Sequence, residues 1–165
     1  MQSKKNEEGG KPADLDDFVD QMQRAVIEDM RKIYSPQVVE KFLNPRNVGV
    51  IENPDGFARF TGPCGDTMEM YLRIRDGAVR EVKFQTDGCG SSIVCGSMAT
   101  ELAENKEIAE IREITQEKVL DALGGMPEEE EHCALLAATT LNMALNDYLA
   151  NKREPWKKIY RVRGS

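Results

Sequence analysis

Near the start of the chain, apolar residues recur every three or four positions, which is the spacing of one face of an α-helix. The residues of this stripe are Leu15, Phe18, Val19, Met22, Val26, Met30 and Ile33. We therefore expect an amphipathic helix over residues 14–33, with Asp14 as its N-cap. A proline directly after Ser35 predicts a second helix, which ends near Asn44-Pro45.

In the middle of the chain, the apolar period changes from helical to alternating, as is typical of β-strands. Strands are predicted over residues 57–61, 67–75 and 78–86, with a hairpin turn at Asp76-Gly77 between the last two. Three antiparallel strands of this kind form one sheet, and helices are expected to cover one of its faces.

The remainder of the chain is predicted to be helical. One helix, capped by Ser91 or Ser92, runs to about residue 105, and a short one covers 107–111. Another begins after Thr115 and stops at Gly124-Gly125, and the last covers 128–152. Strands followed by helices indicate an α+β fold.

This pattern divides the chain into four segments. Residues 1–13 are polar and are expected to form a disordered tail, and residues 14–33 are a helical extension. Residues 34–152 make the main domain. Residues 153–165 are a basic tail, which we interpret as a mobile end that docks on an acidic surface.

Charge and composition exclude several functions. A chain of 165 residues with a net charge of -7 has no general basic face for nucleic acid. The first residues contain no apolar run of the kind that forms a signal peptide. No helical stretch is long and apolar enough to cross a membrane. We therefore expect a cytoplasmic protein whose thiols are reduced.

The four cysteines are the candidate chemistry. Cys64 lies in a turn between Pro63 and Gly65, Cys89 is flanked by glycines, and Cys133 follows the only histidine, His132. We expect these three thiols to be exposed, and Asp66 and His132 to add oxygen and nitrogen donors to a soft-metal site. Cys95 lies among apolar residues of a helix and is interpreted as a buried structural thiol, although its closeness to Cys89 keeps a metal role open.

Helix starts favour thiolates, because backbone N–H groups there point at an anion. This effect is expected to lower the pKa of Cys89. At Cys133 the same effect is opposed by the acidic run over residues 128–131, and the sequence does not decide between the two.

Four ordered motifs resemble the U-type iron-sulfur cluster scaffolds, namely IscU and the N-terminal domain of NifU. They are Phe42-Leu43-Asn44-Pro45-Arg46-Asn47-Val48-Gly49, Pro63-Cys64-Gly65-Asp66, Asp87-Gly88-Cys89-Gly90-Ser91-Ser92 and His132-Cys133-Ala134-Leu135-Leu136-Ala137. The resemblance covers residues 34–152 and implies a compact α+β domain that assembles a [2Fe-2S] cluster as a scaffold rather than an enzyme. It assigns the assembly site to Cys64, Asp66, Cys89 and Cys133, with His132 as an alternative ligand.

The same resemblance implies how the scaffold works. A cysteine desulfurase supplies sulfur, an electron donor such as a ferredoxin reduces it, and the finished cluster passes to apo-proteins. We expect Cys133 to accept the persulfide sulfur, because a helix start presents it. We expect Asp66 to make the cluster labile, because a carboxylate is a harder ligand than a thiolate. Zinc is expected as an occupant of the resting site.

The chain departs from the family pattern at three places. Glu129 and Glu130 stand where an apolar residue and a lysine are usual, which argues against recognition by a dedicated heat-shock chaperone. Cys95 replaces a small residue, and so a fourth thiol could join the cluster. The helix over 14–33 is an addition, and its apolar stripe must pack on its own domain or across a homodimer.

A zinc-binding sulfur acceptor of the SufU type, which stimulates a desulfurase without building clusters, is the alternative function. SufU relatives carry an insertion and an arginine at the position of His132, and this chain has neither.

Overall fold

The structure is a computed structural model that describes residues 13–156, with side chains described from Leu15 onward. The described residues form two units, which divide between Ile33 and Tyr34. The first unit is a single helix, α1 (Ala13–Ile33), which confirms the predicted N-terminal helix. The tails predicted over residues 1–13 and 153–165 lie outside the described part of the chain except at residue 13, where α1 begins, and at residues 153–156, where Arg153 still belongs to the last helix.

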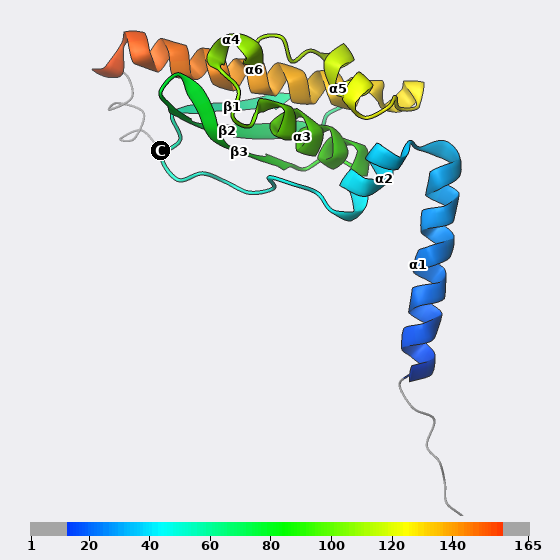
Figure 1. Cartoon of the computed structure of the whole chain (residues 1–165). Coiled ribbons are helices and arrows are strands. Elements are labelled where there is room, and N and C mark those ends of the chain that lie inside the picture. Colours follow the sequence, from blue (N-terminus) through cyan, green and yellow to red (C-terminus); the bar gives the residue numbers. More distant parts are fainter. Residues whose placement is uncertain (1–12, 157–165) are drawn as a thin grey trace, which may run out of the picture. The chain divides into compact units, whose positions relative to one another are not determined.

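The second unit contains one antiparallel sheet in the order β1-β2-β3, as predicted (Figure 1). Its strands are β1 (Gly56–Thr61), β2 (Thr67–Arg75) and β3 (Ala78–Thr86). The turn between β2 and β3 places Asp76 at φ 54 and Gly77 at φ 74. Positive φ at both residues is the geometry of a tight hairpin turn, which an Asp-Gly pair favours.

Helices cover one face of this sheet. They are α2 (Pro36–Leu43), α3 (Gly90–Ala103), α4 (Ile108–Ile111), α5 (Gln116–Ala122), the 3-10 turn η1 (Glu128–Glu130) and α6 (Glu131–Arg153). The long helix α6 packs on β1 and β2, and α3 packs on β3 (Figure 1). Every second side chain of β2 is buried against them. The fold is therefore α+β, as the sequence predicts.

Two helix boundaries differ from the sequence prediction. The helix α3 begins at Gly90 with Cys89 as its N-cap, so neither Ser91 nor Ser92 is the cap. The reason is that both serine hydroxyls bind other side chains, Ser91 to Glu130 and Ser92 to Asp66. At the other helix, the first turn after Pro127 is 3-10, and α6 itself begins at Glu131 rather than at residue 128.

No helix in the described part of the chain is both long enough and apolar enough to span a lipid bilayer.

Gly96 allows α3 to lie close to the sheet. A Cβ at this position would be 2.5 Å from Cε2 and 2.6 Å from Cδ2 of the buried Phe84 ring. In an exposed helix, replacing glycine by alanine would stabilise the protein by about 1 kcal/mol. Overpacking a core costs about 1–3 kcal/mol, so we expect packing to dominate here.

We predict that Gly96→Ala lowers the free energy of unfolding by roughly 1 kcal/mol, as measured by urea denaturation. Because the contact is with Phe84, the Gly96→Ala/Phe84→Leu double variant should lose less stability than the sum of the two single variants. Additive losses, or a more stable Gly96→Ala protein, would contradict this prediction.

Candidate metal centre

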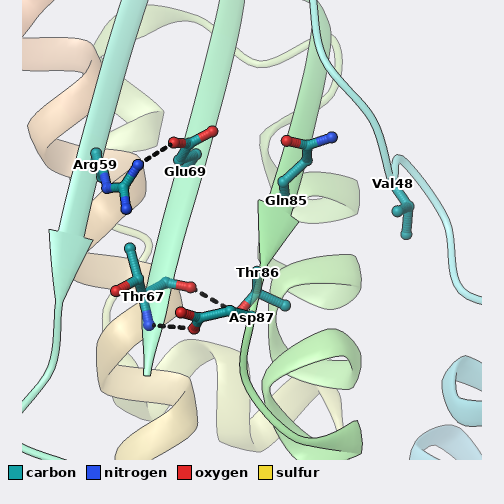
Figure 2. Close-up of a pocket in the computed structure, with 7 residues that line it drawn as sticks. All are labelled: Val48, Arg59, Thr67, Glu69, Gln85, Thr86 and Asp87. Atoms are coloured by element: carbon teal, nitrogen blue, oxygen red, sulfur yellow. Dashed lines mark hydrogen bonds and ion pairs between the residues drawn. The ribbon is translucent and has the colours of Figure 1, made fainter. Parts of the chain in front are cut away.

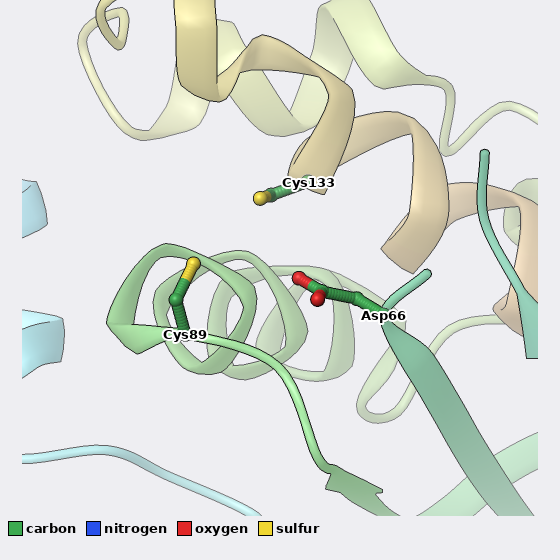
Figure 3. A group of neighbouring side chains, drawn as sticks. All are labelled: Asp66, Cys89 and Cys133. Atoms are coloured by element: carbon green, nitrogen blue, oxygen red, sulfur yellow. The ribbon is translucent and has the colours of Figure 1, made fainter. Parts of the chain in front are cut away.

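Three segments that are far apart in the sequence bring potential metal ligands together. Asp66 lies just before β2, Cys89 lies between β3 and α3, and Cys133 is in the first turn of α6. One ligand atom from each lies within 4.8 Å of the other two, and Figure 3 shows the three side chains pointing toward one another. This spacing is close enough for one metal centre to contact all three.

The pairing of β2 with β3 explains why Asp66 and Cys89 meet. In this antiparallel pair, Met68 at the start of β2 lies opposite Thr86 at the end of β3. The residues just outside the pair are therefore neighbours at one edge of the sheet. The Thr67 backbone N–H donates to Asp87 Oδ1 at 2.7 Å, which fixes this end. Cys133 reaches the same edge because α6 packs across β1 and β2.

A buried serine holds two of the three ligands. Ser92 Oγ is 2.9 Å from Asp66 Oδ2 and 3.6 Å from Cys133 Sγ, and the side chain has no exposed surface. Since one hydroxyl carries one proton, it donates to either the carboxylate or the sulfur at a given moment. Gly88 leaves room for this pair, because a Cβ there would be 2.6 Å from Ser92 Oγ and 2.7 Å from Asp66 Oδ2.

The two thiols of the group differ in environment. Partial burial raises the pKa of Cys89, but the backbone N–H groups of Ser92 and Ser91 and then their hydroxyls outweigh it, and the net pKa is lowered. At Cys133, burial is the main reason that the pKa is raised to about 11. The hydroxyl of Ser92 lowers this pKa, and the negative charge of Cys89 raises it further. Desolvation, which the sequence could not reveal, therefore decides the protonation of Cys133.

The sequence prediction that three thiols are exposed is wrong for Cys133. Cys64 and Cys89 are exposed, whereas Cys133 is completely buried. The packing of the α6 N-terminus against the rest of the second unit causes this burial, so a position at a helix start did not guarantee access to solvent.

The remaining candidate ligands lie outside the group of three. Cys64 is on the exposed turn between β1 and β2, and exposed His132 has Nε2 at 3.6 Å from Cys133 Sγ. Cys95 is buried in the core, as expected, with its Sγ at 3.4 Å from Met126 Sδ. Burial raises the pKa of this thiol. Cys95 is therefore a packed side chain in this structure.

Glu130 links two further residues beside the centre. Its Oε1 accepts a hydrogen bond from Tyr34 Oη at 2.7 Å, and its Oε2 accepts one from Ser91 Oγ at 2.8 Å. The hydrogen bond to Glu130, followed by desolvation, raises the pKa of Tyr34 to about 12. No local pattern indicates the contact to Tyr34, because 96 positions separate the two residues.

A second concave site lies on the sheet face away from α6. It is an open pocket of about 380 Å³ lined by Val48, Arg59, Thr67, Glu69, Gln85, Thr86 and Asp87 (Figure 2). Arg59 pairs with Glu69 at 3.1 Å across neighbouring strands. The lining of this pocket contains no thiol, so it does not compete with the centre as a soft-metal site.

The difference between the two thiols predicts their order of alkylation by iodoacetamide in the metal-free protein. Only a thiolate reacts, and with a pKa near 11, Cys133 is roughly one part in a thousand thiolate at pH 8. We expect Cys89 to react about tenfold faster or more, as measured by peptide mass spectrometry. The rate at Cys133 should keep rising with pH up to about 11. Equal rates at neutral pH would contradict the prediction.

The contact between Glu130 and Tyr34 predicts a second titration. Replacing the carboxylate in Glu130→Gln should lower the Tyr34 pKa from about 12 toward its ordinary value near 10. Ultraviolet absorbance of phenolate measures this, with Tyr34→Phe in both backgrounds to isolate the signal. The matched control is Glu129→Gln, because Glu129 is exposed and makes no hydrogen bond to Tyr34. A similar shift in both glutamine variants would show that the hydrogen bond is not the cause.

Comparison with known proteins supplies the family. The family model described as the NifU-like N terminal domain matches residues 33–155. The iron-sulfur cluster assembly scaffold protein IscU 1 of Archaeoglobus fulgidus is 46% identical over 117 residues, which is 70% of this chain and 76% of that protein. The scaffold protein IscU of Aquifex aeolicus is 39% identical over 119 residues, with the same two shares.

A solved structure supports the fold. The N-terminal NifU-like protein from Brucella abortus superposes with a TM-score of 0.58 at 20% sequence identity, covering 72% of this chain and 95% of that one. At that identity the match concerns the fold alone. The family model and the sequence relatives confirm the resemblance carried by the four motifs, and the chain belongs to the family of IscU and the NifU N-terminal domain.

Proposed function

We propose that this protein is a scaffold that assembles a [2Fe-2S] cluster and passes it to apo-proteins. The observation that carries the proposal is the convergence of Asp66, Cys89 and Cys133 within 4.8 Å. Two sulfurs and one oxygen suit iron, and the relatives at 46% and 39% identity are named as cluster assembly scaffolds. Iron and sulfide are thus substrates that this site gathers and then releases.

Two irons bridged by sulfides need four protein ligands. Asp66, Cys89 and Cys133 are three of them in the proposal, and Cys64 is the fourth. Cys64 is exposed on the turn that also carries Asp66. Between them, Gly65 has φ +90, and nothing lies within 4 Å of the position that a Cβ would take there. The turn therefore has space for Cys64 to approach the group. His132 is the alternative fourth ligand, because it adjoins Cys133 at 3.6 Å.

Sulfur arrives in the proposal as the persulfide of a cysteine desulfurase, and Cys133 accepts it. His132 takes the thiol proton, and the thiolate attacks the outer sulfur of the persulfide. A new S–S bond then forms on Cys133 while the donor cysteine leaves as thiolate. Two electrons from a donor such as a ferredoxin reduce that sulfur to sulfide.

The competing acceptor is Cys89, which is favoured by its exposure and its lowered pKa. Mass spectrometry after reaction with desulfurase and cysteine distinguishes the two, because the added sulfur stays on one peptide. Sulfur found first on the Cys89 peptide, with none on Cys133, would reassign the acceptor without affecting the scaffold proposal.

The scaffold proposal is tested by incubating the protein without oxygen with ferrous iron, cysteine and a cysteine desulfurase. A visible chromophore with bound iron and sulfide is expected, and Cys89→Ala and Cys133→Ala should lose it. Cys95→Ala is the matched control, because that thiol is packed in the core and should not be needed. Cluster transfer is then followed as the gain of the chromophore by an added apo-ferredoxin.

The same experiment tests the alternative, a zinc-binding sulfur acceptor. Two thiolates, one carboxylate and a fourth donor also fit tetrahedral zinc. Protein that retains zinc, stimulates the desulfurase and develops no chromophore would establish that function instead.

Asp66 is proposed to make the cluster labile. A carboxylate binds iron as a harder ligand, and its replacement leaves a position that the softer imidazole of His132 can take. We predict that the cluster on Asp66→Ala decays more slowly, by roughly three- to tenfold, in an anaerobic absorbance assay. Glu129→Ala removes a nearby exposed carboxylate and should decay like the parent. Equal or faster decay in Asp66→Ala would remove Asp66 from this role.

A further inference from the structure

The helix α1 has an apolar stripe that it cannot shield from water by itself. Its exposed members lie between 42% and 68% accessible, and they are Leu15, Phe18, Val19, Met22, Val26 and Ile33. α1 forms a unit of its own, with 21 residues. In proteins, most of the stability of a helix comes from packing its apolar face rather than from the helix alone. The stripe therefore needs a partner.

The spacing of the stripe suits a partner helix of the same length. Eleven positions separate Leu15 from Val26, and eleven also separate Met22 from Ile33. An eleven-residue repeat corresponds to 3.67 residues per turn, close to the 3.6 of a straight helix. The stripe thus runs nearly parallel to the helix axis, and two such helices can stay in contact from end to end.

Charge along α1 is divided between its two halves. Between Leu15 and Asp20 the charged residues are Asp16, Asp17 and Asp20, all acidic. From Arg24 to Ile33 there are three basic residues and two acidic ones, and two of the bases, Arg31 and Lys32, lie in the last turn. A parallel pair would place aspartates against aspartates. An antiparallel pair places the acidic half of one helix against the more basic half of the other.

We propose that α1 binds α1 of a second copy of this chain in an antiparallel pair. In this register Leu15 faces Ile33 of the other copy, Phe18 faces Met30, and Met22 faces Val26. The antiparallel arrangement also places the positive N-terminal end of each helix dipole beside the negative C-terminal end of the other. The two Ile33 ends, where the second units attach, lie roughly 27 Å apart along the pair at 1.5 Å per residue.

The size of this contact predicts a weak dimer. Six apolar side chains bury on the order of 400–700 Å² per helix, somewhat less than the about 800 Å² per partner of a standard stable interface. The full-length, metal-free protein should therefore show a monomer–dimer equilibrium within the micromolar range in sedimentation equilibrium.

The first test places a charge in the stripe. Met22→Asp should weaken dimerisation by about tenfold or more, because the pair would bury an unpaired carboxylate. Gln21→Asp introduces the same side chain one position earlier, on a face of α1 away from the stripe, and it should leave the equilibrium unchanged within about twofold. Circular dichroism at low concentration checks that both variants keep their helix content. Equal effects of the two variants, or a parent that stays monomeric at every concentration, would overturn the proposal and favour packing on the chain's own second unit.

The second test determines orientation by exchanging charges. The triple variant Asp16→Lys/Asp17→Lys/Asp20→Lys makes both halves basic and should weaken an antiparallel dimer by about tenfold at low salt. Adding Arg31→Glu/Lys32→Glu makes the second half acidic and should restore association. In a parallel dimer, the triple variant would change little and the combined variant would pair worse. That result would overturn the antiparallel arrangement, and none of these measurements depends on cluster assembly.

Discussion

The hydrogen-bonded register between β2 and β3 is the constraint on which the centre depends. It sets Met68 opposite Thr86, and so the residues just beyond the pair, Asp66 and Cys89, meet at one edge of the sheet. A shift of one residue would turn every side chain of β2 to the other face. Such a shift would expose the buried side chains of β2 and would also move the ligands apart. The core and the site therefore depend on the same pairing.

Burial then makes the three ligands unequal. Asp66 is half-buried, Cys89 is exposed, and Cys133 is fully buried beside the hydroxyl of Ser92. The same helix start that favours a thiolate at Cys89 contributes hydroxyls and backbone N–H groups to its surroundings. At Cys133, loss of solvent outweighs such help. One small site thus contains a sulfur that is easily ionised and a sulfur that is not.

Much of this fold could be predicted from local pattern. Alternation identified β2, the Asp-Gly pair identified the hairpin, and apolar spacing identified α1. The family motifs selected five candidate ligands, and Asp66, Cys89 and Cys133 are the three that converge. Burial of Cys133, the hydrogen bond between Tyr34 and Glu130, and the use of Ser91 and Ser92 by side chains could not be predicted. These depend on segments that meet only after folding, and no local spacing encodes such distances.

The contrast between exposed Cys89 and buried Cys133 gives the site an order of events. In the proposed function, a protein that delivers sulfur and a protein that collects the cluster both approach the group from the side on which Cys89 is exposed. Two proteins that need the same side cannot be bound there together. The proposal therefore implies alternation, in which the donor departs before the recipient docks.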